Sequence, residues 1–464
     1  MNLPKTAYLW AALLILAIVV SGRIEKKAPD GAAPLTGTNF QEVIGAEQQT
    51  RLGFSSLLAS VPSRSTEALE SAYKTYSKLA LQRPVPNSTR RALIIGGALK
   101  KPLAEKLVAD LKSDLNGLKT PAIERDAELR LWEALYGAGK AKAEPGDEAR
   151  IKQMELGTLE DRALADLYTK LGRKADAETA TTRLTSTATS YLLKAGTTML
   201  FMLLSGLFGV GLLVLFLVAA CTRRWQLIGR IATQPQRVPP GPLLDAFLFY
   251  MALYRVVGVI LGFAVSKINL SSPVPLLLLV QFGTGAGAIF YALWRARQYE
   301  GSLLDLGWTK KNLASNIFYG YAGWCATLPV LILAGLISQK IFHGSNNAPN
   351  PVLPLLASDK SIIDRLLIFC LAAIGAPLFE EFFFRGTLFA SFRKTTPWVV
   401  AALLSGAIFA MVHPLQDWIP ILALGFSFGI IREMRQSLVP GIVAHFFQNT
   451  MAFLMLSSIF GLIK

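Results

Sequence analysis

The stretch that decides the fold is Leu203-Leu-Ser-Gly-Leu-Phe-Gly-Val-Gly-Leu-Leu-Val-Leu-Phe-Leu-Val-Ala-Ala220, which contains no charged residue. An apolar run of about 18 or more residues is long enough to cross the hydrocarbon core of a bilayer as a helix. The whole chain of 464 residues agrees, because 52% of its residues are hydrophobic and only 17% are charged. Soluble domains carry about 25% charged residues. The sequence therefore predicts a membrane protein rather than two or three soluble domains.

Further apolar segments follow along the chain, and they predict an all-α, multi-pass transmembrane bundle. The expected segments are 197–220, 244–266, 275–296, 316–339, 364–389, 397–413, 418–433 and 439–462. We assign 197–237 to one transmembrane helix with a basic linker, and 238–464 to the membrane core.

The first apolar run, 7–20, is short for a membrane span and also fits the core of a signal peptide. The residues that follow it, Val19-Val20-Ser21-Gly22, are a poor cleavage site for a signal peptidase. We therefore expect residues 1–22 to form an uncleaved anchor.

Residues 23–196 have a different composition and predict a small α-helical domain. Residues 23–45 are rich in Gly, Pro, Ala and Thr, which is typical of a tether. Apolar residues then recur at helical spacing in 66–80, 122–136 and 159–171, with breaks at Pro84/Pro86, Gly137-Ala-Gly139 and Pro145-Gly146. The stretch 167–178 resembles the joint of a tetratricopeptide repeat, although no 34-residue period accompanies it. We expect this domain to bind a protein partner.

The net charge of +16 indicates membrane topology rather than nucleic-acid binding. After residue 196 the surplus lies in short loops between apolar segments, where positive charge orients the chain and attracts anionic lipids. Alternating the segments from a cytoplasmic 223–237 places twelve Lys and Arg inside and five outside. This bias predicts that residues 23–196 lie outside the cytoplasm, unless one segment is re-entrant and reverses everything beyond it. The twelve are Arg223, Arg224, Arg230, Arg237, Arg295, Arg297, Lys310, Lys311, Arg393, Lys394, Arg432 and Arg435.

Few residues are available for chemistry. The three cysteines, Cys221, Cys325 and Cys370, lie within or at the end of apolar runs, so neither a disulfide framework nor a cysteine-rich metal site is expected. There are also only three histidines. Of these, His343 lies in a polar loop, whereas His413 and His445 lie in apolar segments.

The run Leu378-Phe-Glu-Glu-Phe-Phe-Phe-Arg-Gly-Thr-Leu388 places two carboxylates and an arginine inside one apolar segment. A charged side chain at the centre of a span costs about 2.5–3.5 kcal/mol, so it requires a partner or a function. Glu381 and Arg385 are four residues apart and are predicted to form an ion pair on one helix face. Glu380 is displaced around the axis by about 140° and must find another environment, which suits a general base.

Two further polar pairs follow at the same spacing of one helical turn. Phe409 and His413 close one apolar segment, and His445 and Asn449 open the last. Counted at about 1.5 Å per residue from the flanking loop residues, Glu380 and His413 lie about 20–24 Å above the same face. His445 counts to only about 8 Å by the same rise, which conflicts with a common site unless segment 418–433 enters only part-way.

Glu380-Glu381-x-x-x-Arg385, Phe409-x-x-x-His413 and His445-x-x-x-Asn449, in this order, resemble the three motifs of the CPBP family. These are the CAAX-processing and bacteriocin-processing intramembrane proteases, also called Abi proteins. We expect the resemblance to cover residues 240–462, so it says nothing about 23–196. It implies a glutamate-dependent endopeptidase of a bacterial inner (plasma) membrane, acting on a protein or peptide in the bilayer.

The resemblance also implies a role for each motif residue. Glu380 would activate the attacking water with help from His413, and His445 and Asn449 would stabilise the developing oxyanion. Glu381 and Arg385 would lock the helix, and Phe409 would support His413. No cofactor is implied.

Three alternatives remain open at this stage. Glu380, His413 and His445 are also a plausible zinc set, with Asp417 as a further carboxylate, although an HExxH arrangement is absent. A non-proteolytic scaffold or immunity-type protein would use the same fold to bind a partner. A transporter would use Asp245, Arg255 and Glu380 as an ion path, but no inverted repeat supports it.

Overall fold

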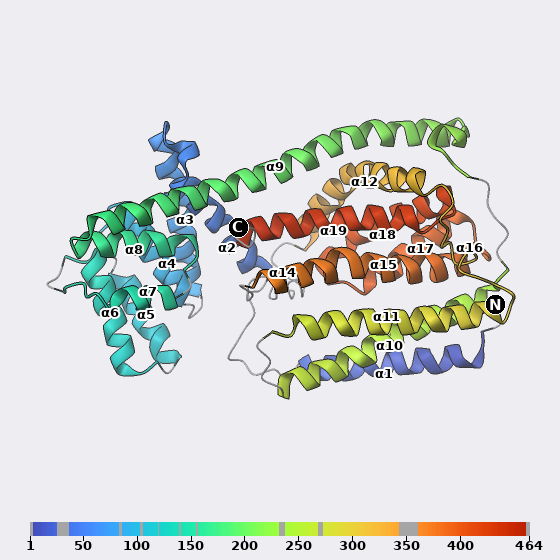
Figure 1. Cartoon of the computed structure of the whole chain (residues 1–464), viewed down its shortest axis with the longest axis horizontal. Coiled ribbons are helices and arrows are strands. Elements are labelled where there is room, and N and C mark those ends of the chain that lie inside the picture. The colour runs from blue at the N-terminus through green and yellow to red at the C-terminus, as the bar shows by residue number, and fades with distance from the viewer. Residues whose placement is uncertain are drawn as a thin grey trace. The chain divides into compact units, whose positions relative to one another are not determined.

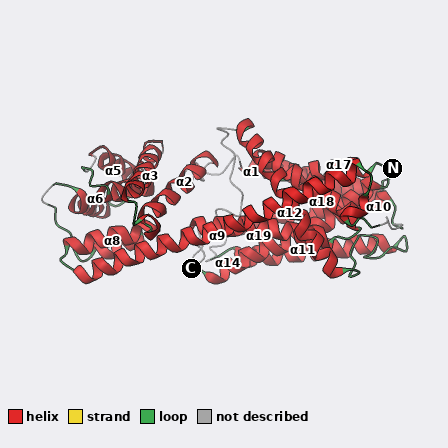
Figure 2. Ribbon diagram, turned by 90° about the horizontal axis from the view of Figure 1, so that it is seen from above, coloured by secondary structure: helices red, strands yellow, loops and turns green. Residues whose placement is uncertain are grey.

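The description rests on a computed structural model in which residues 3–25, 37–82, 86–102, 105–118, 120–138, 141–154, 156–231, 237–267, 272–342 and 361–460 are described. Within these ranges every regular element is a helix (Figure 2). The predicted all-α class is therefore confirmed. His343 and most of the predicted tether lie outside the described residues.

The described residues form two compact units, which we treat separately. The helical unit lies within Leu35–Thr198, and the membrane unit lies within Met1–Pro34 and Met199–Leu456. The helices of the helical unit are α2 (Gly37–Phe54), η1 (Ser56–Leu58), α3 (Pro62–Gln82), α4 (Pro86–Ala98), α5 (Glu105–Gly117), α6 (Ala122–Tyr136), α7 (Asp147–Gln153), α8 (Thr158–Lys170) and the first half of α9 (Lys174–Cys221).

The predicted helices 66–80, 122–136 and 159–171 correspond to α3, α6 and α8. Their apolar faces meet in one core around Tyr76 and Trp132, both of which are fully buried. The turn between α8 and α9 passes through Gly172, whose φ of +75° is a left-handed conformation that favours glycine. The predicted helix-turn-helix joint is therefore present.

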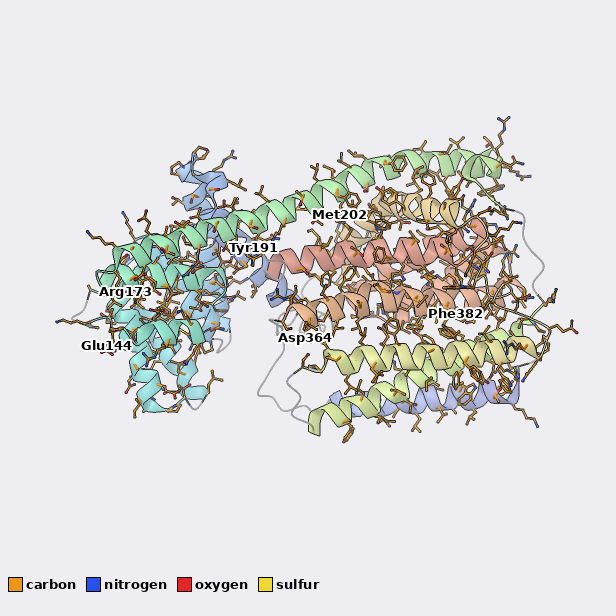
Figure 3. All side chains as sticks on the ribbon, viewed as in Figure 1. Glu144, Arg173, Tyr191, Met202, Asp364 and Phe382 are labelled. Carbon is orange, nitrogen blue, oxygen red and sulfur yellow. The ribbon has the colours of Figure 1, made fainter. Side chains whose placement is uncertain are left out.

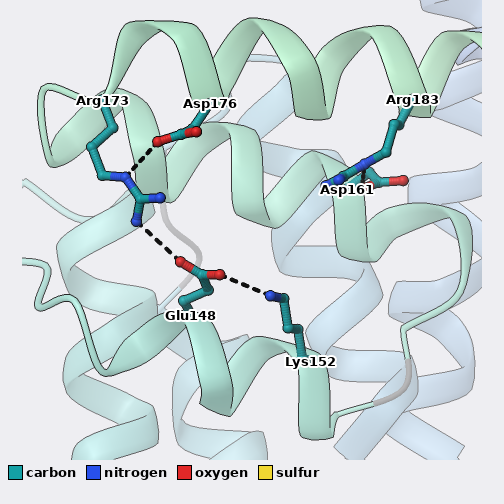
Figure 4. A network of polar contacts seen from close by, with 6 residues as sticks. All are labelled: Glu148, Lys152, Asp161, Arg173, Asp176 and Arg183. Carbon is teal, nitrogen blue, oxygen red and sulfur yellow. Dashed lines mark hydrogen bonds and ion pairs between the residues drawn. The ribbon is translucent and has the colours of Figure 1, made fainter.

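A surface network of charges joins α7, α8 and α9 in the helical unit (Figure 4). Glu148 accepts hydrogen bonds from Lys152 at 2.8 Å and from Arg173 at 3.0 Å. These two bonds stabilise the ionised carboxylate and lower the pKa of Glu148 from 4.5 to about 2. The bond between Glu148 and Arg173 therefore links α7 to the turn between α8 and α9.

The membrane unit contains the remaining helices (Figure 1). They are α1 (Lys5–Glu25), the second half of α9, η2 (Trp225–Ile228), α10 (Pro240–Lys267), α11 (Val274–Arg297), α12 (Leu313–Ile341), α14 (Ile362–Phe369), η3 (Cys370–Gly375), α15 (Ala376–Glu381), η4 (Phe382–Phe389), α16 (Ala390–Arg393), α17 (Trp398–Met411), η5 (Leu415–Asp417), α18 (Trp418–Arg435) and α19 (Val439–Phe460).

Six of the described helices are long and apolar enough to cross a membrane. They are α9, α10, α11, α12, the continuous run from α14 to α16, and α19. Each predicted apolar segment after residue 196 coincides with one helix or one run of helices. The interpretation as a multi-pass membrane protein is therefore supported by the lengths of these helices.

The N-terminal helix α1 packs along α10, and a buried carboxylate joins it to the unit. Asp245 on α10 is fully buried and pairs with Arg295 at 2.9 Å. It also accepts hydrogen bonds from the hydroxyls of Thr6 and Tyr291, each at 2.8 Å. The charge of Asp245 is thus satisfied inside a structural cluster, which gives it a role other than the ion path considered above.

The core of the membrane unit is rich in phenylalanine. Phe382, Phe383 and Phe384 are each no more than 2% exposed, and they belong to one core cluster with side chains of α10, α11 and α17. Figure 3 labels Phe382 within this part of the unit. These consecutive aromatic residues surround the helix on several sides, which holds the preceding two residues, Glu380 and Glu381, at a fixed position.

Candidate active site

Two π-helical segments flank the paired carboxylates. The run from α14 to α16 is helical throughout, but η3 and η4 are π-helical, with α15 between them. Glu380 and Glu381 are the last two residues of α15. Single π-helical turns are rare in proteins, but those that occur are often found at functional sites.

Glu381 and Arg385 form the predicted ion pair. The distance from Nη1 of Arg385 to Oε1 of Glu381 is 3.1 Å, and both side chains are fully buried. Arg385 also donates a hydrogen bond to the carbonyl oxygen of Gly425 at 3.2 Å. Its guanidinium lies over the rings of Phe409 and Phe428, 4.7 and 5.2 Å from their centroids. Arg385 therefore connects three helices, and the ion pair expected from the spacing of four residues is present.

His445 lies between the two carboxylates. Its Nδ1 is 3.2 Å from Oε1 of Glu381, and its Nε2 is 3.8 Å from Oε2 of Glu380. A carboxylate accepts hydrogen bonds, so Nδ1 carries the proton that faces Glu381, and Nε2 of a neutral ring is then an acceptor. The gap between Nε2 and Glu380 is too long for a direct hydrogen bond and is wide enough for a bridging water.

The two carboxylates differ in exposure. The side chain of Glu381 is fully buried, whereas 25% of the side chain of Glu380 is exposed. In the described part of the chain, Glu380 has no ion-pair partner within 4 Å other than His445. Glu380 is therefore the carboxylate that a substrate or water can reach.

The structure brings His445 to both carboxylates, although counting residues places it nearer the membrane face than Glu380. The turn before α19 does not lie at the surface, because Ser437 and Leu438 are each only 1% exposed. The amide of Leu438 donates to the carbonyl of Gly307 at 2.8 Å, which holds the turn inside the unit.

Gly441, in the first turn of α19, allows this close approach. A Cβ at this position would lie 2.8 Å from Oε2 of Glu381, closer than such atoms normally come. The start of α19 thus passes directly beside the carboxylate pair.

Asn449 joins α19 to the π-helical segment η3. Its Nδ2 donates to the carbonyl oxygen of Ala372 at 2.7 Å. In η3 the amide of Ala376 bonds to Leu371, five residues earlier. The next donor in this pattern would be residue 377, which is a proline without an N–H group. The side chain of Asn449 therefore supplies the hydrogen bond that the backbone cannot.

His413 lies at the end of α17. Its Nδ1 is 2.8 Å from the carbonyl oxygen of Phe409, and the two rings are 4.9 Å apart in an edge-to-face arrangement. Phe409 in turn lies 5.9 Å from the ring of His445. No ion pair within 4 Å joins His413 to Glu380 among the described residues. The structure thus places Phe409 between the two histidines.

Two tyrosines near Glu380 are not predicted from the sequence motifs. Tyr250 and Tyr254 on α10 both interact electrostatically with Glu380. The ring of Tyr250 stacks on Phe383 at 4.0 Å, which fixes α10 against η4. Their spacing of four residues inside an apolar segment is the signal that points to them.

The residues considered for zinc do not converge. In the described ranges no group of three His, Cys, Asp or Glu side chains is arranged to hold a metal ion. The Nδ1 atoms of His413 and His445 face Phe409 and Glu381, respectively. Each ring thus keeps Nε2 for another contact, and the zinc alternative stays a prediction.

Comparison with known protein families finds one whose model matches the part of the chain that contains this site. Residues 362–451 match the family described as type II CAAX prenyl endopeptidase Rce1-like. This range includes every motif residue from Glu380 to Asn449. The resemblance predicted from the motifs is confirmed over this range, which is shorter than the expected 240–462.

A curated relative agrees with this match. The chain is 26% identical over 151 residues to "Putative membrane peptidase YdiL" of Bacillus subtilis (strain 168). The similarity covers 32% of this chain and 59% of that protein. No solved structure matches the chain.

Proposed function

We propose that this chain is an intramembrane endopeptidase that hydrolyses a peptide bond of a membrane-associated or lipidated protein. The observation that carries the proposal is the difference between the two adjacent carboxylates. Glu381 is buried and paired with Arg385, whereas Glu380 is partly exposed and faces Nε2 of His445. One carboxylate is thus fixed and the other is free to react.

The proposed reaction begins at Glu380. Its carboxylate removes a proton from a water molecule, and the water oxygen attacks the scissile carbonyl carbon. Glu380 then transfers this proton to the amide nitrogen as the C–N bond breaks, which regenerates the carboxylate. His445 is placed to orient the water, because its Nε2 faces Glu380 across a gap of 3.8 Å.

The other polar groups of the site stabilise the negative charge on the carbonyl oxygen, position water or support the helix in this proposal. Asn449 uses one amide hydrogen for Ala372 and keeps a second for an oxyanion. Because Nδ1 of His413 donates to Phe409, Nε2 of the neutral ring is an acceptor that suits positioning water. Glu381 and Arg385 hold the helix, and Phe409 separates the two histidines.

The proposal is tested by the change Glu380→Gln, which removes the base and keeps the shape. We expect membranes from cells that produce this variant to lose specific new protein termini found with the wild-type chain, when the two are compared by proteomics of membrane fractions. Glu300→Gln is the matched control, because Glu300 is an exposed acid in a loop outside the site. Identical termini with wild type and Glu380→Gln would refute the proposal.

We further propose that the reaction requires no metal ion. The purified chain, reconstituted in lipid and given a substrate identified by the proteomic comparison, should keep its activity in a strong chelator. Loss of activity in chelator, followed by recovery on addition of Zn²⁺, would favour the zinc alternative.

A non-proteolytic scaffold is the second candidate. The observation in its favour is that the family match covers only 362–451, whereas the helical unit is a separately packed domain outside this match. If the chain is a scaffold, cells with Glu380→Gln should keep the wild-type phenotype, and deletion of residues 37–198 should abolish it. If the chain is a protease, Glu380→Gln alone should abolish the phenotype.

We propose a bacterial inner (plasma) membrane as the location, with residues 23–196 outside the cytoplasm. The basis is the bias of twelve Lys and Arg against five in the loops.

A further inference from the structure

A long apolar groove lies on the membrane unit, on the side of α18 away from the candidate active site. Its volume is about 660 Å³, and it is lined by the second half of α9 and by α12, α17 and α18. The lining includes Leu213 and Phe216 of α9, Val330 of α12 and Phe426 of α18. This volume lies within the range of about 300–1,000 Å³ that is typical of ligand sites.

On one side of the groove, α9 and α12 approach each other very closely at Gly209. A Cβ on Gly209 would overlap the backbone carbonyl of Cys325, so the two helices touch there only because residue 209 is glycine. The hydroxyls of Ser205 and Tyr321 lie 3.1 Å apart just before this crossing. Beyond it, the α9 residues Leu212, Leu213, Leu215 and Phe216 line the groove.

One end of the groove is basic. It is formed by Phe216 near the end of α9, Phe318 near the start of α12, and Arg435 at the end of α18. The exposed side chains of four Lys and Arg follow α9 or precede α12 at this end, and none has an ion-pair partner within 4 Å in the described part of the chain. They are Arg223, Arg224, Lys310 and Lys311.

Glu433 and Arg435, which lie near the end of α18, already have partners within the fold. Glu433 is already paired with Arg230 at 3.2 Å and with Arg393 at 3.0 Å. Arg435 donates to Asn316 at 3.2 Å and to Ser315 at 3.0 Å, and its guanidinium lies 4.0 Å from the ring of Tyr319. Arg435 is therefore held by the fold, and the four exposed cations remain available to an anion.

We propose that the groove binds an anionic phospholipid. An acyl chain lies along the apolar lining, and the phosphate lies among Arg223, Arg224, Lys310 and Lys311. A protein strand in this place would leave backbone groups without hydrogen bonds in the bilayer, which a lipid chain does not. A neutral lipid would leave the four cations unmatched. This site goes beyond the proposed proteolysis and does not depend on it.

The position of the groove gives the lipid a structural effect. Phe426 and Ser427 of α18 face the groove, whereas the neighbouring residues Gly425 and Phe428 contact Arg385 and His445 on the other side of the same helix. A lipid in the groove therefore packs against the helix that supports the carboxylate pair, and it should raise the melting temperature of the chain.

The test is native mass spectrometry of the full chain, purified in mild detergent and titrated with phosphatidylglycerol or phosphatidylcholine. We expect the wild type to bind phosphatidylglycerol at least ten-fold more tightly than phosphatidylcholine. Val330→Trp fills the groove and should abolish binding, and Leu336→Trp is the matched control on the same helix. Leu336 is 60% exposed and lies outside the lining.

The charge contribution is tested separately on exposed residues that do not support the fold. The double change Arg223→Gln and Arg224→Gln should remove most of the preference for phosphatidylglycerol. Arg297→Gln with Lys340→Gln removes the same charge from exposed positions outside the groove and should leave binding unchanged.

Three results would overturn the proposal: equal binding of the two lipids by the wild type, unchanged binding in Val330→Trp, or equal loss in both double variants. If Val330→Trp does not fold, the charge variants decide, because their changes are on the surface.

Discussion

The amide Nδ2 of Asn449 lies 2.7 Å from the carbonyl oxygen of Ala372 and donates a hydrogen bond to it. This bond fills the vacancy that Pro377 creates in the backbone pattern of η3. Asn449 therefore has a structural task in addition to its proposed catalytic one. The two tasks are separable by experiment.

We predict that Asn449→Ala lowers the free energy of unfolding by about 1–3 kcal/mol, because a buried carbonyl loses its hydrogen bond. Asn449→Gln keeps the donor group and should recover part of the cleavage activity that Asn449→Ala loses. The measurements are thermal unfolding in detergent and cleavage by the reconstituted chain. Full stability in Asn449→Ala would show that Ala372 finds another donor.

The buried pair of Glu381 and Arg385 should be far more important for stability than Glu380. Removing one partner of a buried ion pair leaves an uncompensated charge and costs about 3–5 kcal/mol. We therefore expect Glu381→Gln to lower the melting temperature strongly, whereas Glu380→Gln changes it little. The double variant Glu381→Leu with Arg385→Leu removes both charges and should be more stable than Glu381→Gln. A lower stability for Glu380→Gln than for Glu381→Gln would contradict this assignment.

Acid should weaken the contacts among α7, α8 and α9. The folded pKa of Glu148 is about 2, below its ordinary value of 4.5, because Lys152 and Arg173 hydrogen-bond to the carboxylate. A lowered pKa gives stability that is present above pH 4.5 and is lost as the pH falls from 4.5 toward 2. Between pH 7 and pH 3 the melting temperature of Glu148→Gln should therefore fall less than that of the wild type.

The control for this pH effect is Glu124→Gln, because Glu124 is exposed on α6 outside the network. Its melting temperature should follow the wild type at both values of pH. Parallel curves for the wild type and Glu148→Gln would show that the network in Figure 4 contributes nothing to acid sensitivity.

The proposed orientation is testable with a membrane-impermeant thiol reagent on intact cells. Cys221 is exposed at the end of α9, on the side assigned to the cytoplasm. It should react only after the membrane is permeabilised. In a Cys221→Ser background, Ser113→Cys on the exposed face of α5 should react in intact cells. The opposite pattern would reverse the orientation.

The sequence predicts the helices well because hydrophobicity and spacing determine them. The predicted 122–136 coincides with α6, and the predicted pair of Glu381 and Arg385 forms as expected from their spacing. These features depend on residues close together in the chain. Local pattern is therefore sufficient for them.

The parts that sequence alone does not reveal depend on contacts between distant residues. The position of His445 beside both carboxylates depends on how α19 packs against α15, and a count of residues along the chain does not show this packing. The partner of Asn449 depends on a π-helical segment, and apolar periodicity does not distinguish π-helix from α-helix over six residues. The attachment of α1 through Thr6 and Asp245 joins residues 239 positions apart.

The two π-helical segments have a consequence for how this span tolerates insertions and deletions. A π-helical turn holds one residue more than an α-helical turn, so deleting one residue within η3 would let ordinary α-helical bonding resume. The residues after this deletion would keep nearly the same rotation relative to α14, because the longer π-helical turn and the α-helical turn that replaces it both close one full turn of the helix. Deleting one residue from the α-helical α14 would instead rotate everything after it by about 100° relative to the start of the span, the angle of one residue in an α-helix. Glu381 would then turn away from His445, and Arg385 would leave Gly425. The span is therefore expected to tolerate the loss of one residue within η3 better than the same loss within α14.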